Sequence, residues 1–282
     1  MGTLFVVATP IGNLEDITLR ALRVLREADL IVAEDTRTTA KLLARYDIHT
    51  PMLSFFEHNE LRRLDEIIHA LADKNLALVS EAGMPGISDP GYRLIRAALD
   101  SGFPVVPVPG PSALITALAV SGLPADRFIY LGFLPRKRVD RQRLLASVRY
   151  EPYTLVAFEA PHRLLDSLTD VLTVLGDRTM AVGRELTKIH EEVRRGPVSS
   201  HIAHFQNEAP RGEFTFVIAG APEGEKWTEE GVRQAIAGLL IHGESALTVA
   251  KEVASLSGWP RQRIYRMALE MGLIEKHGRG RE

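Results

Sequence analysis

The chain has 282 residues, of which 45% are hydrophobic and 25% are charged, and its formal net charge at pH 7 is −2. These values exclude a disordered chain and a uniformly basic surface, and the absence of cysteine excludes disulfides, thiolate metal sites and a cysteine nucleophile. The N-terminus lacks a basic segment and no apolar run approaches the ~20 residues that cross a membrane, so we expect a cytoplasmic protein.

Short apolar runs alternate with amphipathic stretches from the N-terminus to about Gly220. The expected strands are 4–8, 30–34, 52–56, 76–80, 104–108, 128–132, 153–158, 179–183 and 213–219. Helical periodicity is clearest at 59–73 and 161–175, where apolar residues recur every three or four positions. This alternation predicts an α/β fold with mostly parallel sheets. The strands are too many for one typical sheet of about 4–6 strands, so we expect two α/β domains.

The expected domains are 1–118, 119–222 and 226–282. The first break lies near the turn Ser121–Pro124, and the second lies in the linker-like stretch 221–226. The last segment differs from the rest, because its pattern predicts only helices, which are 228–241, 245–256 and 260–271, with Gly243-Glu244 as a turn.

Two interpretations of this helical tail remain open. The last two helices resemble a helix-turn-helix unit that presents Arg261, Arg263 and Arg266 to a nucleic acid. Alternatively, the tail is a small helical cap that packs the apolar residues Ile236, Leu240, Leu247 and Val253.

Four loops that follow expected strands are rich in glycine and proline. In Leu78–Gly91, Gly83 and Gly86 allow the backbone to approach a ligand, and Asp89 with Pro90 is expected to begin a helix that ends before Gly102. Similar loops are Thr9–Asn13, Pro109–Ala113 and Glu159–Arg163. Because ligands bind at the carboxyl ends of strands in open α/β sheets, these loops predict a ligand site.

Several common catalytic motifs are absent from the sequence. It contains no Walker loop, no HExxH, no GxSxG and no dinucleotide-binding GxGxxG after a strand, which disfavours a nicotinamide dehydrogenase or an ordinary Rossmann-type methyltransferase. The histidines are scattered, and His201 and His204 are expected on a solvated surface, so we expect no metal site.

Six sequence blocks carry a resemblance to a known family. They are Thr9–Leu14, Ala33–Arg37, Val79–Pro85 with Ser88–Gly91, Pro107–Pro111, Gly132–Pro135 and Arg184–Lys188. In this order they resemble the ribosomal RNA small subunit methyltransferase I group of the tetrapyrrole methylase superfamily. The resemblance spans about 1–220, and the helical tail is also similar.

The resemblance implies a two-domain methyltransferase that holds S-adenosylmethionine in the cleft between its domains, as a homodimer. It also implies methyl transfer to the ribose 2′-hydroxyl of a decoding-centre cytidine in small-subunit ribosomal RNA, with the assembled small subunit as the expected partner. The cofactor-binding positions carried over by this resemblance are Pro10, Gly12, Glu81, Ala82, Gly83, Met84, Pro109, Gly110, Ser112, Ala113, Phe133, Gly212 and Phe214.

Two positions depart from the patterns of the superfamily and the group. Tetrapyrrole methylases proper have a Gly-Pro-Gly-Asp type first loop where this chain has Thr9–Asn13, which points away from a porphyrinoid substrate. Within the group, threonine is more frequent where this chain has Met84.

A weakly acidic 2′-hydroxyl is activated by a nearby base or cation. Our candidates are Asp35 and Glu159 as bases, and Arg37 and Lys188 as electrostatic or phosphate-positioning groups. Asp35 follows an expected strand directly, but it is equally placed to cap a helix over Thr36–Arg45. Glu159 has a similar alternative as a cap before Pro161.

A basic run follows the Gly132–Pro135 block. Its members are Arg136, Lys137, Arg138, Arg141 and Arg143. It predicts either phosphate binding or a solvated helix face, and its place beside a ligand loop keeps both interpretations open. Besides ribosomal RNA methylation, the sequence leaves open a small-molecule tetrapyrrole methyltransferase and a non-enzymatic regulator that binds nucleic acid.

Overall fold

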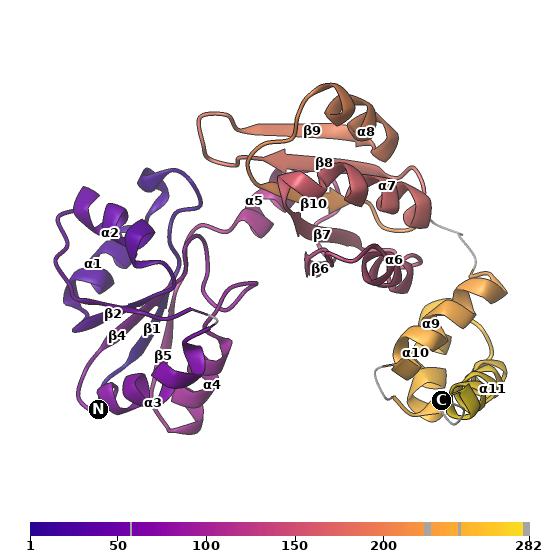
Figure 1. Cartoon of the computed structure of the whole chain (residues 1–282), viewed down its shortest axis with the longest axis horizontal. Coiled ribbons are helices and arrows are strands. Elements are labelled where there is room, and N and C mark those ends of the chain that lie inside the picture. The colour runs from indigo at the N-terminus through magenta and orange to yellow at the C-terminus, as the bar shows by residue number, and fades with distance from the viewer. Residues whose placement is uncertain (57, 223–226, 242–243, 279–282) are drawn as a thin grey trace. The chain divides into compact units, whose positions relative to one another are not determined.

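The computed structural model describes residues 1–56, 58–222, 227–241 and 244–278 (Figure 1). These residues form two compact units, of which unit 1 comprises Met1–Thr116 with Arg184–Glu192, and unit 2 comprises Ala117–Gly183 with Val193–Glu282. Residues 223–226 of the expected linker, which include the start of the expected third domain, and Gly243 of the expected turn lie outside the described residues.

Unit 1 contains a five-stranded sheet in the order β3-β2-β4-β1-β5. Its strands are β1 (Leu4–Val7), β2 (Leu30–Ala33), β3 (Met52–Ser54), β4 (Leu76–Val79) and β5 (Val105–Val108). All four neighbouring pairs are parallel. The central strands are apolar on both faces because helices cover both, which confirms the α/β class that the alternating pattern predicts.

The helices of unit 1 bury two separate cores against this sheet. They are η1 (Leu14–Asp16), α1 (Leu19–Glu27), α2 (Thr36–Arg45), α3 (Glu60–Ala70), α4 (Tyr92–Asp100) and α5 (Ala113–Val120), the last of which continues into unit 2. One core packs Leu25, Leu42 and Leu43 of α1 and α2, and the other packs Ile67 of α3 and Leu94 of α4. The sheet is therefore held from both faces, and its carboxyl edge is left to the loops.

The start of α4 differs from the sequence prediction. The helix begins at Tyr92, its N-cap is Gly91 with a φ of 128°, and Asp89 with Pro90 still belongs to the preceding loop. Backbone torsion explains the difference, because Gly86 at φ 82° and Ser88 at φ 63° keep this segment out of the helical region. Gly102 follows the helix with a φ of 79°, as expected for a residue just beyond a helix end.

Unit 2 contains a mixed five-stranded sheet in the order β6-β7-β10-β8-β9. Its strands are β6 (Phe128–Phe133), β7 (Thr154–Glu159), β8 (Thr179–Arg184), β9 (Glu192–Pro197) and β10 (Phe214–Ile218). Strands β6 and β7 are parallel, whereas β10 runs antiparallel to β7. The helices are α6 (Arg138–Ser147), η2 (Pro161–Arg163), α7 (Leu164–Leu175) and α8 (Val198–Asn207).

Two features of unit 2 escaped the sequence analysis. Strand β9 has the sequence EVRRGP at the edge of the sheet, and its charge hides it from a search for apolar runs. His201, expected on the surface, is only 1% exposed on α8, and its Nε2 lies 3.3 Å from the Met180 carbonyl oxygen. Burial lowers the pKa of this imidazole, which favours its neutral form in the folded protein.

The tail forms three helices, in agreement with the sequence pattern. They are α9 (Glu229–Ile241), α10 (Ala246–Ser257) and α11 (Arg261–Gly278). Ile236 and Val253 are fully buried, whereas Leu247 is 59% exposed and lies outside the core that the cap interpretation expected. The described residues contain no helix that is both long and apolar enough to span a bilayer.

A buried ion pair joins α6 to α7. The Arg141 guanidinium lies 2.6 Å from a carboxylate oxygen of Asp170, and both side chains are less than 5% exposed. Asp170 also accepts hydrogen bonds from Arg138 and Gln142, so its charge is fully engaged. Such a pair costs desolvation to form, but losing one partner leaves the other charge without compensation.

We expect Arg141→Met to destabilise the protein by about 3 kcal/mol, because it removes one partner of this buried pair. Arg143→Met is the matched control, since Arg143 lies on the same helix with a half-exposed side chain, and we expect a change within about 0.5 kcal/mol. Urea unfolding of both variants measures the two effects. Equal effects would show that burial of the Arg141 charge contributes nothing.

Candidate cofactor and substrate site

Three loops meet at the carboxyl edge of the unit 1 sheet. The Thr9 amide donates to the Gly83 carbonyl at 2.9 Å, and the Gly83 amide donates to the Thr9 carbonyl at 3.0 Å, which links the loops after β1 and β4. The loop after β5 lies beside them, because a Cβ on Gly83 would be 3.8 Å from the Pro111 carbonyl oxygen. The sequence-predicted cofactor residues of unit 1, from Pro10 and Gly12 through Glu81–Met84 to Pro109–Ala113, thus lie on adjacent loops.

Gly83 is the residue around which these loops turn. It is buried, and its φ of 80° is one that side-chain-bearing residues seldom adopt. Gly110 is constrained by contact, since a Cβ there would lie 3.0 Å from the Ala8 side chain. Glu81, Pro109 and Gly110 are exposed. The edge therefore combines a buried, tightly turned glycine with exposed backbone at Pro109 and Gly110.

A group of acids lies beside these loops, and for two of them, Glu34 and Asp89, the sequence pattern predicted no role in a site. The Glu34 carboxylate accepts a hydrogen bond from the Glu81 amide at 3.1 Å. Burial raises the pKa of Glu34, and burial together with the nearby Glu34 charge raises the pKa of Asp89 to about 7. Glu34 could have been found from the sequence, because it is an acidic residue that directly follows β2 and lies inside the Ala33–Arg37 block.

Asp35 is the N-cap of α2. Its Oδ1 accepts hydrogen bonds from the amides of Arg37, at 2.7 Å, and Thr38, at 3.3 Å, and its Oδ2 pairs with the Arg37 guanidinium at 2.9 Å. The side-chain and backbone hydrogen bonds from Arg37 lower the pKa of Asp35 to about 2. This confirms the capping interpretation, and it makes the Asp35 carboxylate a weak base. The Arg37 side chain remains 88% exposed.

Lys188 lies against the first loop of unit 1. The Asn13 amide donates to Thr187 Oγ1 at 3.0 Å, and the Lys188 ammonium pairs with Glu185 at 2.9 Å. A Cβ on Gly12 would overlap Lys188 Cγ. The glycine therefore permits the close approach that brings Lys188 to the predicted cofactor loop.

Glu159 is 1% exposed at the end of β7. It accepts from the Ala160 amide at 2.8 Å, pairs with Arg163 at 2.5 Å and accepts a hydrogen bond from the Ser167 hydroxyl. These bonds anchor η2 and α7 and direct both carboxylate oxygens to protein donors. The expected cap before Pro161 is wrong, because the N-cap of η2 is Ala160 and no side chain caps this helix.

The cofactor candidates of unit 2 differ in accessibility. The Phe133 side chain is 55% exposed, and its ring packs against Phe158 with centroids 5.5 Å apart. Gly212 has a φ of 86° in the loop before β10. The Phe214 side chain is 2% exposed in the core of unit 2, so only its backbone is placed to meet a ligand.

The basic run divides into exposed and buried cations. Arg136 and Lys137 are exposed, and within the described part of the chain neither forms an ion pair. Arg138 and Arg143 are exposed but paired with acids of unit 2. Arg141 corrects the expectation of five surface cations, because its guanidinium is buried against Asp170 and cannot reach a phosphate on the surface.

In the tail, Arg261, Arg263 and Arg266 are all exposed. Arg263 pairs with Glu229 at 2.8 Å and lies over the Trp259 ring, 4.2 Å from its centroid. It therefore stabilises the helical unit, whereas Arg261 and Arg266 are the more accessible cations.

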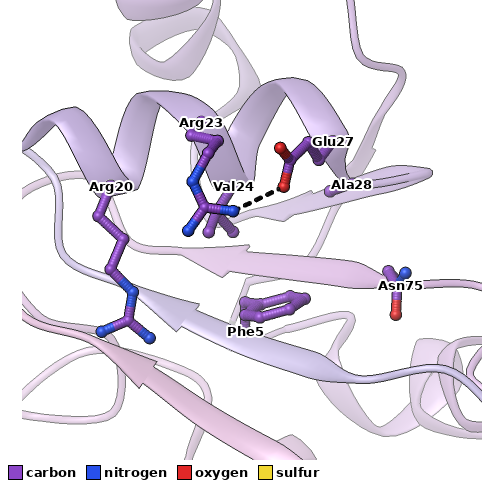
Figure 2. A pocket seen from close by; sticks show the side chains of 7 residues that line it. All are labelled: Phe5, Arg20, Arg23, Val24, Glu27, Ala28 and Asn75. Atoms are coloured by element: carbon purple, nitrogen blue, oxygen red, sulfur yellow. Dashed lines mark hydrogen bonds and ion pairs between the residues drawn. The ribbon is translucent and has the colours of Figure 1, made fainter.

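A small pocket of about 100 Å³ lies between α1 and β1, away from these loops. Figure 2 shows Phe5 beneath the helix, with Arg23 turned toward Glu27, to which it donates at 2.9 Å. Arg23 and Glu27 thus compensate each other on the helix surface, and the residues of this pocket serve as control positions outside the candidate site.

Comparison with known proteins places the chain in a family. Residues 3–201 match the model for Tetrapyrrole (Corrin/Porphyrin) Methylases. Ribosomal RNA small subunit methyltransferase I of Synechocystis is 46% identical over 275 residues, covering 96% of this chain and 99% of the relative. The chain belongs to the ribosomal RNA small subunit methyltransferase I family. The relative of the same name from Thermotoga maritima is 53% identical over 221 residues, covering 78% of this chain and 99% of the relative.

Solved structures show the same fold at low identity. Diphthine synthase has a TM-score of 0.62 at 14% identity, covering 77% of this chain and 90% of that one. Uroporphyrin-III C-methyltransferase from Thermus thermophilus, complexed with S-adenosylhomocysteine, has a TM-score of 0.54 at 20% identity, covering 77% of this chain and 97% of that one. The family membership confirms the resemblance seen in the six sequence blocks.

We expect Gly83→Ala to weaken S-adenosylmethionine binding at least tenfold, because an alanine at this φ strains the turn that joins the loops after β1 and β4. Gly102→Ala is the control, since Gly102 has a φ of 79° with open space around it, outside the three loops. We expect both variants to lose about 1 kcal/mol of stability. Calorimetric titration measures their S-adenosylmethionine affinities, which we expect to differ. If Gly83→Ala binds S-adenosylmethionine normally, the assignment of this loop to cofactor binding is wrong.

The pKa of Asp89 predicts a pH-dependent stability. The folded protein keeps a proton on Asp89 between its ordinary pKa of 3.8 and about 7, whereas the unfolded chain releases it. The stability from this proton is fully present below 3.8 and is lost as the pH rises to about 7. We therefore expect Asp89→Asn to gain a few degrees in Tm relative to wild type between pH 5 and pH 8. Asp100→Asn, at the other end of α4, is the control. A Tm difference that does not change with pH would contradict the raised pKa.

Proposed function

We propose that this protein transfers a methyl group from S-adenosylmethionine to the ribose 2′-hydroxyl of a decoding-centre cytidine in 16S ribosomal RNA. The main support is the Synechocystis relative, whose similarity extends over 99% of its own length and covers the helical tail as well as the α/β units. The likenesses to solved structures, which include tetrapyrrole methylases and diphthine synthase, lie between 14% and 23% identity and concern the fold. They favour no porphyrinoid substrate, and a non-enzymatic regulator has no comparable support.

The residues of unit 1 fit a nucleoside-containing methyl donor. The buried Thr9–Gly83 pair holds two loops together, and the backbone of Pro109 and Gly110 is exposed beside it. S-adenosylmethionine, when bound there, supplies an electrophilic sulfonium methyl group. The chain's task is to align the acceptor oxygen with that group, and orientation of this kind contributes ~7–11 kcal/mol to a reaction.

The four catalytic candidates take different parts in this proposal. Arg37 and Lys188 are cations at the carboxyl edge of unit 1, where they stabilise the developing oxyanion or hold a neighbouring phosphate. Asp35 is a positioning residue, because it fixes the Arg37 side chain and caps α2. Glu159 is a positioning residue in unit 2, where it fixes Arg163 and the start of α7.

The exposed cations Arg136 and Lys137, with Arg261 and Arg266 of the tail, are proposed to contact RNA phosphates. We further propose a cytoplasmic homodimer that acts on the assembled small subunit, as the family resemblance implies. These proposals are supported by the chain's membership in a family whose members are named for small-subunit ribosomal RNA.

Methyl transfer from labelled S-adenosylmethionine tests the proposed function. Small subunits from cells that lack the enzyme serve as substrate, and nuclease digestion with mass spectrometry identifies the product. We expect 2′-O-methylcytidine. Cofactor binding without any transfer to RNA would contradict the proposal and favour another acceptor.

We expect the double variant Arg136→Ala/Lys137→Ala to lower the salt dependence of RNA binding by about one unit of slope for each phosphate that these cations neutralise in the wild type. Arg20→Ala/Arg23→Ala removes the same charge from α1 and is the control. Filter binding over a range of KCl concentrations measures both slopes. If the double variant and the control have the same salt slope, Arg136 and Lys137 contact no phosphate and belong to an ordinary solvated surface.

A further inference from the structure

A groove of about 800 Å³ lies beside the predicted cofactor loop in unit 1. Residues 12–15 form one side, Arg45 at the end of α2 closes one part, and the loop 185–190 forms the other side. A groove of this size accommodates a single nucleotide. Gly12 belongs both to this groove and to the predicted cofactor loop, so a ligand in the groove would neighbour the methyl donor.

The walls of the groove are held by contacts that leave little freedom. The Thr187 amide donates to Glu191 Oε2 at 2.5 Å while its hydroxyl accepts from the Asn13 amide. Tyr46 donates from its hydroxyl to the Leu14 carbonyl at 2.7 Å, which fixes η1 against the end of α2. These bonds preform the groove before any ligand arrives.

The loop 185–190 also carries backbone strain. Glu185 has a φ of 49° and Thr187 a φ of 68°, although neither is glycine. A β-branched residue rarely adopts such torsions, which persist only where surrounding contacts hold them. On this loop Lys188 lies against Gly12, and Ile189 lines the groove with an exposed side chain.

The side chains of the groove are chemically mixed. Lys188 is neutralised by Glu185, but in the described part of the chain neither Arg45 nor the Glu15 carboxylate has an ion-pair partner. A site for a bare phosphate gains nothing from the Glu15 carboxylate. A nucleotide, in contrast, offers an anion to a guanidinium and an amino group to a carboxylate.

Ile189 supplies the apolar part of such a site. Its side chain is 97% exposed, between Lys188 and His190. Single exposed aliphatic residues are common, but this one is held on a strained loop beside a groove with unpaired charges. Unstacked bases of single-stranded RNA present flat apolar faces that pack on such side chains.

We infer that this groove holds the target nucleotide of the RNA, splayed out of its strand. Arg45 contacts its phosphate, Glu15 accepts a hydrogen bond from the exocyclic amino group of the cytosine, and Ile189 covers the base. The inference rests on the proposed function, and it assigns the preference for cytosine over uracil to Glu15, because uracil presents a carbonyl in place of the amino group.

The test is Glu15→Gln, measured as kcat/KM on RNA with cytidine or uridine at the target position. Glutamine both donates and accepts, so we expect the cytidine preference to fall about tenfold or more while S-adenosylmethionine affinity stays unchanged. Glu27→Gln, an exposed glutamate on α1, is the control. An unchanged cytidine preference in Glu15→Gln would overturn the assignment.

A second variant makes the test independent of the base. Arg45→Gln is expected to raise KM for RNA about tenfold and to lower the salt slope of RNA binding by about one, with Arg26→Gln on α1 as the control. No change in either quantity would overturn the phosphate contact. If wild-type protein binds S-adenosylmethionine but methylates no RNA, the proposed function itself fails, which distinguishes that outcome from failure of the groove assignment.

Discussion

The reciprocal backbone hydrogen bonds between Thr9 and Gly83 are the contact on which the site in unit 1 depends. They join the loops of neighbouring strands β1 and β4 at the carboxyl edge of a fully parallel sheet. Parallel strands bring all their carboxyl ends to one edge, but the loops that follow are otherwise free to diverge. Two short bonds between them convert separate turns into one surface of fixed backbone groups, beside which Glu34, Asp89 and Lys188 take their positions.

Charge is used differently in the two units. In unit 2, the buried pair Arg141–Asp170 joins helix α6 to helix α7, and the pair Arg163–Glu159 joins η2 to the end of strand β7. Buried pairs of this kind contribute modestly to stability but penalise any arrangement that separates them. In unit 1 the exposed Arg37 and the groove residue Arg45 are held at the sheet's carboxyl edge or beside it. The same residue type thus specifies packing in one unit and, in the other, carries a charge that we propose for ligand binding.

The sequence predicted the elements that apolar patterning controls. The strands of both sheets except β9 follow apolar runs, and the tail helices follow a 3.6-residue period, so these strands and helices could be predicted. Strand β9 was missed because an edge strand tolerates charge and gains its place from pairing alone. The tight turn at Gly91 shifted the start of α4, since torsions of the preceding loop are set by tertiary contacts.

The site was predictable at the level of loops, and less so for side chains. Glycine and proline after strands marked the loops that meet at Thr9 and Gly83. A run of cations, however, does not say which of its members faces inward, and Arg141 differs from Arg143 only by its position on the turn of α6. The raised pKa of Asp89 depends first on burial and then on the charge of Glu34, a residue 55 positions away, and no local sequence pattern indicates either.

The segment Arg184–Glu192 has a consequence for how this protein can be divided. It is separated in sequence from the rest of unit 1 by residues 117–183, yet it belongs to that unit and supplies one wall of the groove. A fragment that ends at residue 116 would contain the parallel sheet and all three loops, but Gly12 and Asn13 would lose the partners that cover them. The first α/β unit is therefore not a module that evolution or an engineer can transplant as one contiguous stretch of chain.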